Sequence, residues 1–430
     1  MKKFSKYLAN LVTHLVIIGL SLPAASDTLD EILQLTYSSN RQLVLTRAHL
    51  ASQKDAIKLA ISDLGISVSA AFNGSRDWNL KLGSQADSFS TSLIGSYTLS
   101  DGKRSKNKIA LEEYALVKAK YQLEDLEQRI LLETINTYLN ILRDQKFVAL
   151  SKGNVAVLQR QFEEIKDRFN LGEVTRTDVA QAESALASAK ANLTAKNGAL
   201  GVTSEIFLSQ VGVVPNNLKP VVTRFKLPKN IEVAKRRALR QHPKILSATT
   251  LEKMASILID IQKGAKKPLF SLKSALTNGF NQSSGNYNSA SIRLEGSIPI
   301  FNAGRIDNAV SQAESNFKAE KANTELVRRS VLEEVSIAWT NLKVAEATIE
   351  ARKRQIEASK IAYDGVLVEE KLGTRTTLNV INAEQDLLDA RTQLASAERD
   401  HLYATFAVLA SSGDLNIKHL GISTPKSIKK

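Results

Sequence analysis

One segment of the chain recurs 201 residues later, and this recurrence limits the folds that the chain can adopt. LGEVTRTDVAQAESAL at 171–186 and LGTRTTLNVINAEQDL at 372–387 are identical at seven of sixteen positions without a gap. The same offset matches Gly95 with Gly296 and Gly212 with Gly413, so about 120 residues align without an insertion. A tandem duplication of one structural unit is the simplest explanation.

The duplication divides the chain into two repeats and shorter segments. We assign 27–214 to the first repeat and 229–415 to the second, with a linker at 215–228 and a tail at 416–430. Prolines in the linker favour an irregular connection on the surface. Each repeat is expected to hold a helix of moderate length, a strand pair, a very long helix and a shorter helix.

The strand pairs are predicted within 65–99 (strands 65–72 and 88–99) and within 268–300 (strands 268–276 and 289–300), where apolar and polar residues alternate. In SFSTSLIGSYTL (88–99), the large residues Phe89, Leu93, Tyr97 and Leu99 share every second position with the small residues Thr91 and Gly95, and serines fill most positions between them. Alternation of this kind places the apolar residues on one face of a strand. One face of each strand is therefore expected to meet lipid or a protein core, and the other to meet water.

The moderate helices are predicted at 28–62 and 229–263, and the long helices at 104–171 and 305–372. Each long segment lacks proline and contains a single glycine, and an unbroken helix of this length would extend about 100 Å. The following helices carry apolar residues at alternating spacings of three and four. These residues are Val179, Ala182, Leu186, Ala189 and Leu193, and then Val380, Ala383, Leu387, Ala390 and Leu394. Each repeat should therefore form an antiparallel coiled-coil hairpin.

The N-terminus, 1–26, is typical of an export signal, with three lysines, an apolar run and small residues before a cleavage site after Ser26. A membrane anchor is the alternative interpretation of this segment. Cysteine is absent, which excludes disulfides and thiolate sites. Without the signal, the formal charge of +14 becomes +11. The basic residues alternate with acidic ones along helices, which indicates solvated helix faces and argues against nucleic acid as a partner.

Four two-faced strands cannot close a membrane barrel by themselves, because open edges in lipid leave backbone groups without hydrogen bonds. Closure requires several copies of the chain. Three copies would supply twelve strands, with the helices continuing beyond the barrel as a tube.

The chain resembles the TolC family of outer-membrane efflux channels. The resemblance rests on the duplicated helix–strand–strand–helix plan, on SIPIFNAGRIDN after the second strand pair, and on LGEVTRTDV and LGTRTTLNV at the helical turns; it covers about 27–415. It implies a mixed α and β membrane protein, a homotrimer with a twelve-stranded β-barrel in outer-membrane lipid and an α-helical barrel in the periplasm. It also implies docking to a periplasmic adaptor and an inner-membrane transporter, as the exit duct of a tripartite efflux or type I secretion system.

The resemblance also implies site residues at the periplasmic end. The turns at Leu171–Gly172 and Leu372–Gly373 match the tip that meets the adaptor. Thr177, Asp178 and Arg375 match a latch that holds the coils closed, with a charge-assisted pair between Asp178 and Arg375, while Glu370 replaces the tyrosine that the family uses there. Two aspartates that form an acidic entrance constriction in the family correspond here to Asn379 and Asn382, which predicts a ring of uncharged amides.

No combination of residues indicates catalysis or a cofactor. The histidines are scattered, and no zinc-protease, nucleophile-elbow, phosphate-loop or dinucleotide motif is present. We therefore expect no enzyme activity, no cofactor and no metal site. A periplasmic coiled-coil adaptor or structural protein is the alternative function, although adaptors place a lipoyl-like domain around one hairpin. The passenger, whether drug, metal ion or protein, is not encoded in these features.

Overall fold

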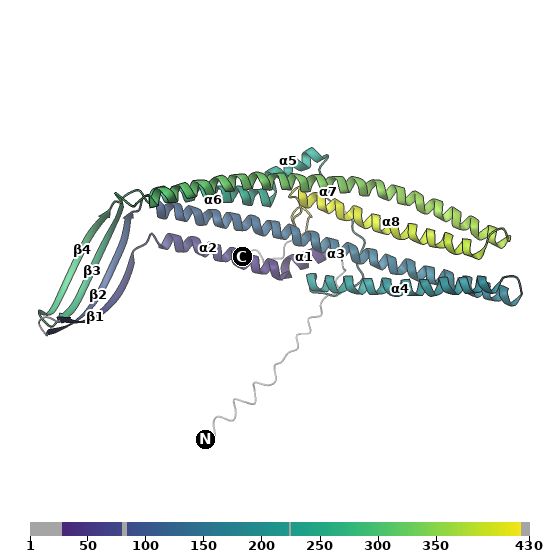
Figure 1. Cartoon of the computed structure of the whole chain (residues 1–430), viewed down its shortest axis with the longest axis horizontal. Helices are drawn as coiled ribbons and strands as arrows, with labels where there is room; N and C mark the ends of the chain where they lie inside the picture. Colours follow the sequence, from purple (N-terminus) through teal and green to yellow (C-terminus); the bar gives the residue numbers. More distant parts are fainter. Residues whose placement is uncertain (1–27, 80–83, 223–224, 423–430) are drawn as a thin grey trace, which may run out of the picture.

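The computed structural model describes residues 28–79, 84–222 and 225–422, which form one elongated body (Figure 1). A four-stranded sheet stands at one end, and long helices run from it to the opposite end. The export signal predicted at 1–26 lies outside the described residues. The elements are α1 (Leu29–Ser39), α2 (Arg41–Ser62), β1 (Ser67–Asn79), β2 (Ser84–Ser100), α3 (Arg104–Asn170), α4 (Arg176–Val211), α5 (Ile231–Gln241), α6 (Pro243–Gly264), β3 (Leu269–Asn281), β4 (Gly285–Ser297), α7 (Arg305–Lys371) and α8 (Thr377–Ser411).

The element order occurs twice, which confirms the tandem duplication. The long helices α3 and α7 each contain 67 residues, and their first residues, Arg104 and Arg305, are separated by the offset found in the sequence. Helices α1 and α5 each contain 11 residues, and α2 and α6 each contain 22. The two halves therefore present equivalent positions that can be compared residue by residue.

The sheet is antiparallel throughout, in the order β1-β2-β3-β4. Its register places large apolar residues opposite one another, as in the pairs Phe89–Phe280, Leu93–Leu276 and Tyr97–Leu272. The opposite face carries serines and an ion pair between Lys273 and Glu295 at 2.7 Å. The two-faced strands expected from the alternation are thus confirmed.

The strand bounds differ from the predicted ones. β1 continues to Asn79, and β4 begins at Gly285 rather than near 289, because backbone pairing extends through polar residues that carry no apolar alternation. β4 also ends at Ser297, before the predicted 300. The next residues include Pro299, which has no N–H to donate to a sheet.

The single helices predicted at 28–62 and 229–263 are wrong, since each is two helices. In the first half Asn40 separates α1 from α2, and its side chain accepts hydrogen bonds from the N–H groups of Gln42 and Leu43. In the second half His242 separates α5 from α6, and Pro243 occupies the first turn of α6. Both breaks arise because the backbone at these residues is extended and the side chain caps the following helix.

The long helices pair with α4 and α8 as two antiparallel hairpins (Figure 1). In each hairpin the predicted apolar seam is buried at its centre. The buried seam residues are Ala182, Leu186 and Ala189 in α4 and Val380, Leu387 and Ala390 in α8. None of the helices within the described residues combines the length and apolar character needed to cross a membrane.

The main core lies near the middle of the long axis, where α1, α3, α4 and α8 meet. Tyr138, Phe207 and Phe406 are its largest buried side chains. The linker contributes to this core, because Leu218 is buried and the Phe225 ring lies 4.9 Å from that of Phe406. The expectation of a surface connection is therefore wrong for these residues. Burial of each large apolar side chain stabilises the fold by about 2 kcal/mol, which favours packing the linker into the core.

The beginning of the C-terminal tail also packs into the main core. Ile417 and Ile422 are buried there beside Leu415. The tail thus helps to fix the second hairpin against the first half of the chain.

Candidate functional site at the hairpin ends

Both hairpins turn at the end farthest from the sheet, and they turn in the same way. The N–H of Gly172 donates to the carbonyl of Phe169, and the N–H of Glu173 donates to that of Arg168, at 3.0 and 2.9 Å. Gly373 and Thr374 make the equivalent bonds in the second hairpin. Gly172 and Gly373 have φ of +79° and +76°, the left-handed conformation that ends helices in this motif. The glycines in the opening repeat are therefore explained by chain reversal.

Leu171 and Leu372 precede these glycines and are exposed at the apex of each hairpin. Among the described residues, no further atom lies within 4 Å of a Cβ built at Gly172 or Gly373. Each hairpin therefore presents an open, apolar tip.

The helices that leave the turns begin with equivalent capping boxes. Thr175 and Asp178 exchange hydrogen bonds at the start of α4, with the Asp178 carboxylate accepting the Thr175 N–H at 2.9 Å. Thr376 and Asn379 do the same at the start of α8, with Asn379 Oδ1 accepting the Thr376 N–H at 3.1 Å. The predicted latch residue Asp178 and the predicted constriction residue Asn379 are thus the same position of the repeat. Both residues stabilise helix starts, a role that the sequence interpretation missed.

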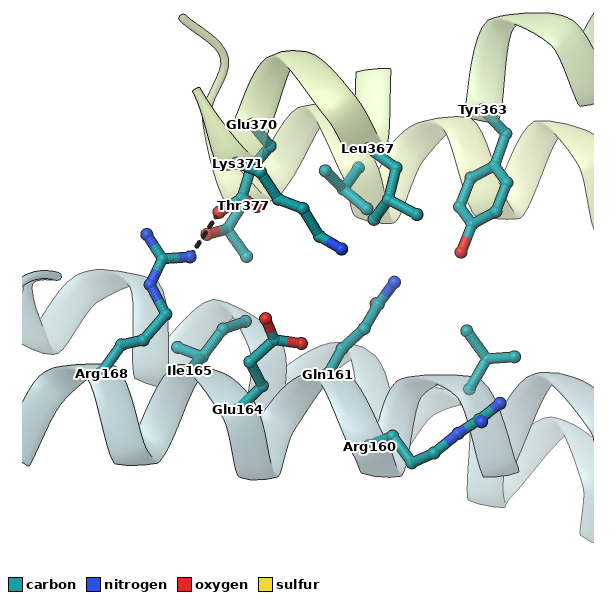
Figure 2. A pocket seen from close by; sticks show the side chains of 12 residues that line it. Arg160, Gln161, Glu164, Ile165, Arg168, Tyr363, Leu367, Glu370, Lys371 and Thr377 are labelled. Carbon is teal, nitrogen blue, oxygen red and sulfur yellow. Dashed lines mark hydrogen bonds and ion pairs between the residues drawn. The ribbon is translucent and has the colours of Figure 1, made fainter. Parts of the chain in front are cut away.

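An ion pair joins the two hairpins close to the turns. Arg168 Nη1 on α3 donates to Glu370 Oε1 on α7 at 2.8 Å (Figure 2). The side chains of Arg168 and Glu370 are only 29% and 13% exposed, so water screens their attraction less than on an open surface. The hydrogen bond from Arg168 to Glu370 raises the pKa of the guanidinium above its usual value.

A cavity of about 260 Å³ lies between the hairpins behind this ion pair. Figure 2 shows Gln161, Leu367 and Tyr363 along its length. Burial raises the pKa of the Tyr363 hydroxyl, and burial likewise raises that of the nearby Glu384 carboxyl on α8. The hairpins are therefore incompletely packed here, and Arg168 with Glu370 closes the end of a loosely filled interface.

The structure does not bring the predicted latch residues Asp178 and Arg375 of one chain together. Arg375 Nε instead donates to Glu369 Oε2 at 2.9 Å, on the same hairpin, and the Asp178 carboxylate serves its own capping box. Thr177 and Asn382 are exposed. A contact between Arg375 and Asp178 of neighbouring copies is left as a proposal.

The Arg168–Glu370 pair was missed by the sequence interpretation. The signal was available, because Glu370 was recognised as a replacement for the family's tyrosine, but no partner was assigned to it. Arg168 precedes the turn by four residues and was treated as part of a solvated helix face. The spatial pairing depends on how α3 and α7 lie side by side, which local patterns do not specify.

The comparisons with known proteins agree with this architecture. A sequence profile described as outer membrane efflux protein matches residues 32–205 and 235–414, one match in each half. The outer membrane efflux protein BepC of Brucella suis is 30% identical over 405 residues, which cover 93% of this chain and 88% of BepC. The outer membrane protein TolC of Salmonella enteritidis is 25% identical over 430 residues, which cover 94% of this chain and 87% of TolC.

Solved structures show the same fold. The CmeC outer membrane channel of Campylobacter jejuni superposes with a TM-score of 0.80, covering 93% of this chain and 90% of CmeC. Its sequence identity is 16%, so this likeness concerns the fold alone.

Proposed function

The chain belongs to the outer membrane efflux protein family, and we infer that its two hairpins form the gate of a passive exit duct. Proteins of this family are outer-membrane exit ducts of efflux and type I secretion systems, and this chain is such a duct. It works as a homotrimer in the outer membrane, extends into the periplasm, and assembles with a periplasmic adaptor and an inner-membrane transporter.

The observation that carries the duct function is a sheet with one apolar and one polar face, continued by helices of 67 residues. Three such sheets supply the twelve strands of a barrel, and a helix of this length spans about 100 Å. The alternative function, a periplasmic adaptor, gives no role to a two-faced sheet of this size.

We propose that the gate opens when the hairpins move apart at the end far from the sheet. In the closed state Arg168 and Glu370 join the two hairpins of one chain. The resemblance implies a latch between hairpins that uses Thr177, Asp178 and Arg375, and we place it between neighbouring chains because Arg375 pairs with Glu369 within one chain. Opening then separates Arg375 from Asp178 of the neighbouring chain, and Arg168 from Glu370.

The proposed entrance constriction consists of Asn379 and Asn382 from three chains. Amides offer hydrogen bonds but no charge, so the entrance attracts cations weakly. The side-chain oxygen of Asn379 is engaged with Thr376, which leaves its NH₂ group free to line the pore.

The proposed adaptor-docking tip consists of Leu171, Gly172, Leu372 and Gly373. Exposed leucines at two equivalent turns give the trimer six apolar tips for a partner that repeats around the same axis. If Leu171→Glu with Leu372→Glu abolishes export while the trimer still assembles, the result supports docking at the tips. Normal export would show that the tips have no docking role.

We also propose that 1–26 is removed on export, that 27–214 and 229–415 are the functional repeats joined by 215–228, and that 416–430 is a tail. The family consists of channel proteins, and we propose that this chain has no catalytic activity and needs no cofactor. The transporter, rather than the duct, selects the passenger.

The experiment that tests the function combines assembly with conduction. The protein extracted from outer membranes in detergent is expected to run as a heat-modifiable trimer and to form ion-conducting pores in planar bilayers. The adaptor and transporter that co-purify with it would identify the export system. A soluble monomer without pore activity would refute the duct and favour the adaptor alternative.

A further inference from the structure

Positive charge is concentrated where the sheet passes into the helices. Eight basic and three acidic side chains, a net charge of +5 per chain, lie in residues 101–108, 263–267 and 305–307 together with Asp63. We call these residues the basic collar. A trimer would carry three such collars around its circumference.

Direct contacts bring the segments of the basic collar together at one level of the molecule. Lys108 Nζ on α3 pairs with Asp63 after α2 at 2.6 Å, and Lys266 after α6 pairs with Asp307 on α7. A side chain built at Gly102 would lie 2.4 Å from the carbonyl oxygen of Gly264, so these two loops touch. Figure 1 shows the four helix ends gathered beside the sheet.

Four exposed cations of the basic collar have no acidic partner among the described residues. No carboxylate of the described chain lies within ion-pair distance of Lys103, Lys106, Lys267 or Arg305. All four residues are exposed. Their charge is therefore available to an external anion.

An exposed apolar rim adjoins the basic collar. Ile300 and Phe301, just before Arg305, are 95% and 89% exposed, and the apolar face of the sheet continues from them. Apolar side chains beside a row of cations are the arrangement expected at the boundary between acyl chains and phosphate head groups. A soluble anion would account for the cations but not for the apolar rim.

We propose that the basic collar binds the phosphates of anionic phospholipids in the periplasmic leaflet of the outer membrane. This inference rests on the proposed function, which places the sheet in lipid and the helices in the periplasm. Lys103, Lys106 and Lys267 supply mobile ammonium groups, and the rim of Ile300 and Phe301 lies among the acyl chains above them. The collar thereby fixes the depth of the barrel in the membrane.

The test measures which lipids accompany the purified trimer. The trimer is reconstituted in nanodiscs of phosphatidylethanolamine with a minority of phosphatidylglycerol, re-extracted, and its adhering lipids are quantified by mass spectrometry. We expect phosphatidylglycerol to be enriched about fivefold. The enrichment should fall towards one in the Lys103→Gln, Lys106→Gln, Lys267→Gln triple variant, and should persist in the corresponding triple arginine variant.

The matched control replaces Lys152, Lys190 and Lys360, which are exposed on the hairpins away from the sheet, with glutamine. It should retain the wild-type enrichment. Equal enrichment in wild type and the collar variant would overturn the proposal. Pore conductance is recorded separately: a protein that forms no pore counts against the duct, whereas an unchanged lipid ratio counts against the collar.

Discussion

Arg168 and Glu370 show how one residue could change the closure of the proposed gate. Glutamate at 370 supplies a carboxylate that meets the guanidinium of Arg168 across the hairpin interface. A tyrosine in that place would offer a neutral hydroxyl to the same neighbour. We therefore expect the proposed closed state to depend on a fixed charge on each hairpin and to weaken as ionic strength rises.

Removal of this ion pair is predicted to loosen the gate with little effect on overall stability. Arg168→Ala or Glu370→Ala should cost about 0–1 kcal/mol, because the pair is partly exposed, and should raise single-channel conductance in planar bilayers. The exchange of charges in Arg168→Glu with Glu370→Arg should restore the wild-type value. Arg160→Ala is the control, because Arg160 lines the same cavity and has no ion pair among the described residues. Equal conductance in all variants would show that the pair has no gating role.

The contact proposed between neighbouring chains is tested separately. Arg375→Ala or Asp178→Ala should also raise conductance, and Asp178→Ala should in addition lose its capping box, at about 1 kcal/mol. Asp178→Asn retains the cap, as Asn379 does in the second half, and isolates the effect of the charge. If Asp178→Asn conducts like wild type while Arg375→Ala does not, Asp178 is not the partner of Arg375.

The amide ring predicts how the pore responds to polyvalent cations. The wild-type pore should resist block, and Asn379→Asp with Asn382→Asp should make it sensitive, because six carboxylates would then concentrate cations at the entrance. Asn379→Asp preserves the capping box, since Asp178 makes the same bonds in the first half. Strong block of the wild-type pore would show that another acidic ring guards the entrance.

At the scale of elements, each interhelical break is made by one capping residue, and the two halves use different residues for it. Asn40 caps α2, whereas His242 caps α6 by accepting the Lys244 N–H at Nδ1. His242 is buried, and Lys244, Glu334 and Asp125 are the charged groups around it. Burial lowers the pKa of His242 below its usual value near 6.5.

This difference predicts that the cap of the second half makes folding stability depend on pH, whereas the Asn40 cap of the first half does not. Because the pKa of His242 is lower in the folded chain than in the unfolded chain, the unfolded chain binds more protons. The stability that this buried neutral imidazole contributes is therefore lost as pH falls below about 6.5. His242→Asn should keep the cap and reduce the loss of thermal stability between pH 7 and pH 5. The thermal midpoint of the trimer at both pH values measures the effect, with His49→Asn, on the exposed surface of α2, as the control. An undiminished loss in His242→Asn would place the titrating group elsewhere.

Opposite effects are predicted for two glycines, Gly172 in the turn after α3 and Gly153 within that helix. Gly172→Ala should cost about 1 kcal/mol, since alanine is strained at a φ of +79° although space is open around it. Gly153→Ala, within α3 and equally uncrowded, should gain up to about 1 kcal/mol. Thermal midpoints in detergent would compare the two. A gain for both would mean that the turn at Gly172 tolerates a side chain.

How much of this could be predicted depends on the range of the interactions. Three patterns are local or duplicated: the alternation in β2, the glycine turns and the heptad seam. They predicted the strand faces and the hairpins, and the bounds of the long helices were predicted to within about one residue. The breaks at Asn40 and His242 were missed because a capping residue within an amphipathic run resembles a solvated position. The burial of Leu218 and Ile417, and the meeting of Arg168 with Glu370, depend on contacts between distant segments that no local pattern contains.

At the scale of the whole molecule, one chain leaves apolar surface that only further copies would cover. Beyond the sheet, α7 carries an exposed apolar stripe at heptad spacings. Its residues are Ile337, Val344, Ala351, Ala358, Ile361, Gly365 and Val368, on the part of α7 that runs towards the turn. The seam of α7 with α8 is already occupied by Leu342 and Ala345, so the stripe is a second face of the same helix. Contact with a helix of the neighbouring chain explains a heptad stripe on a second face.

Charge on this stripe is therefore predicted to prevent assembly. Ile361→Glu with Val368→Glu would place six carboxylates in the interfaces of a trimer, where a desolvated charge without a partner costs several kcal/mol, and the heat-modifiable trimer should be lost. Lys353→Glu with Lys360→Glu introduces the same carboxylates, seven residues apart, at exposed positions of α7 outside the stripe, and should assemble. Crosslinking and size-exclusion chromatography of the detergent-extracted proteins would compare the variants. If the stripe variant formed a normal trimer, the stripe would line water rather than a neighbouring chain, and the apolar residues of α7 would belong to the wall of the duct.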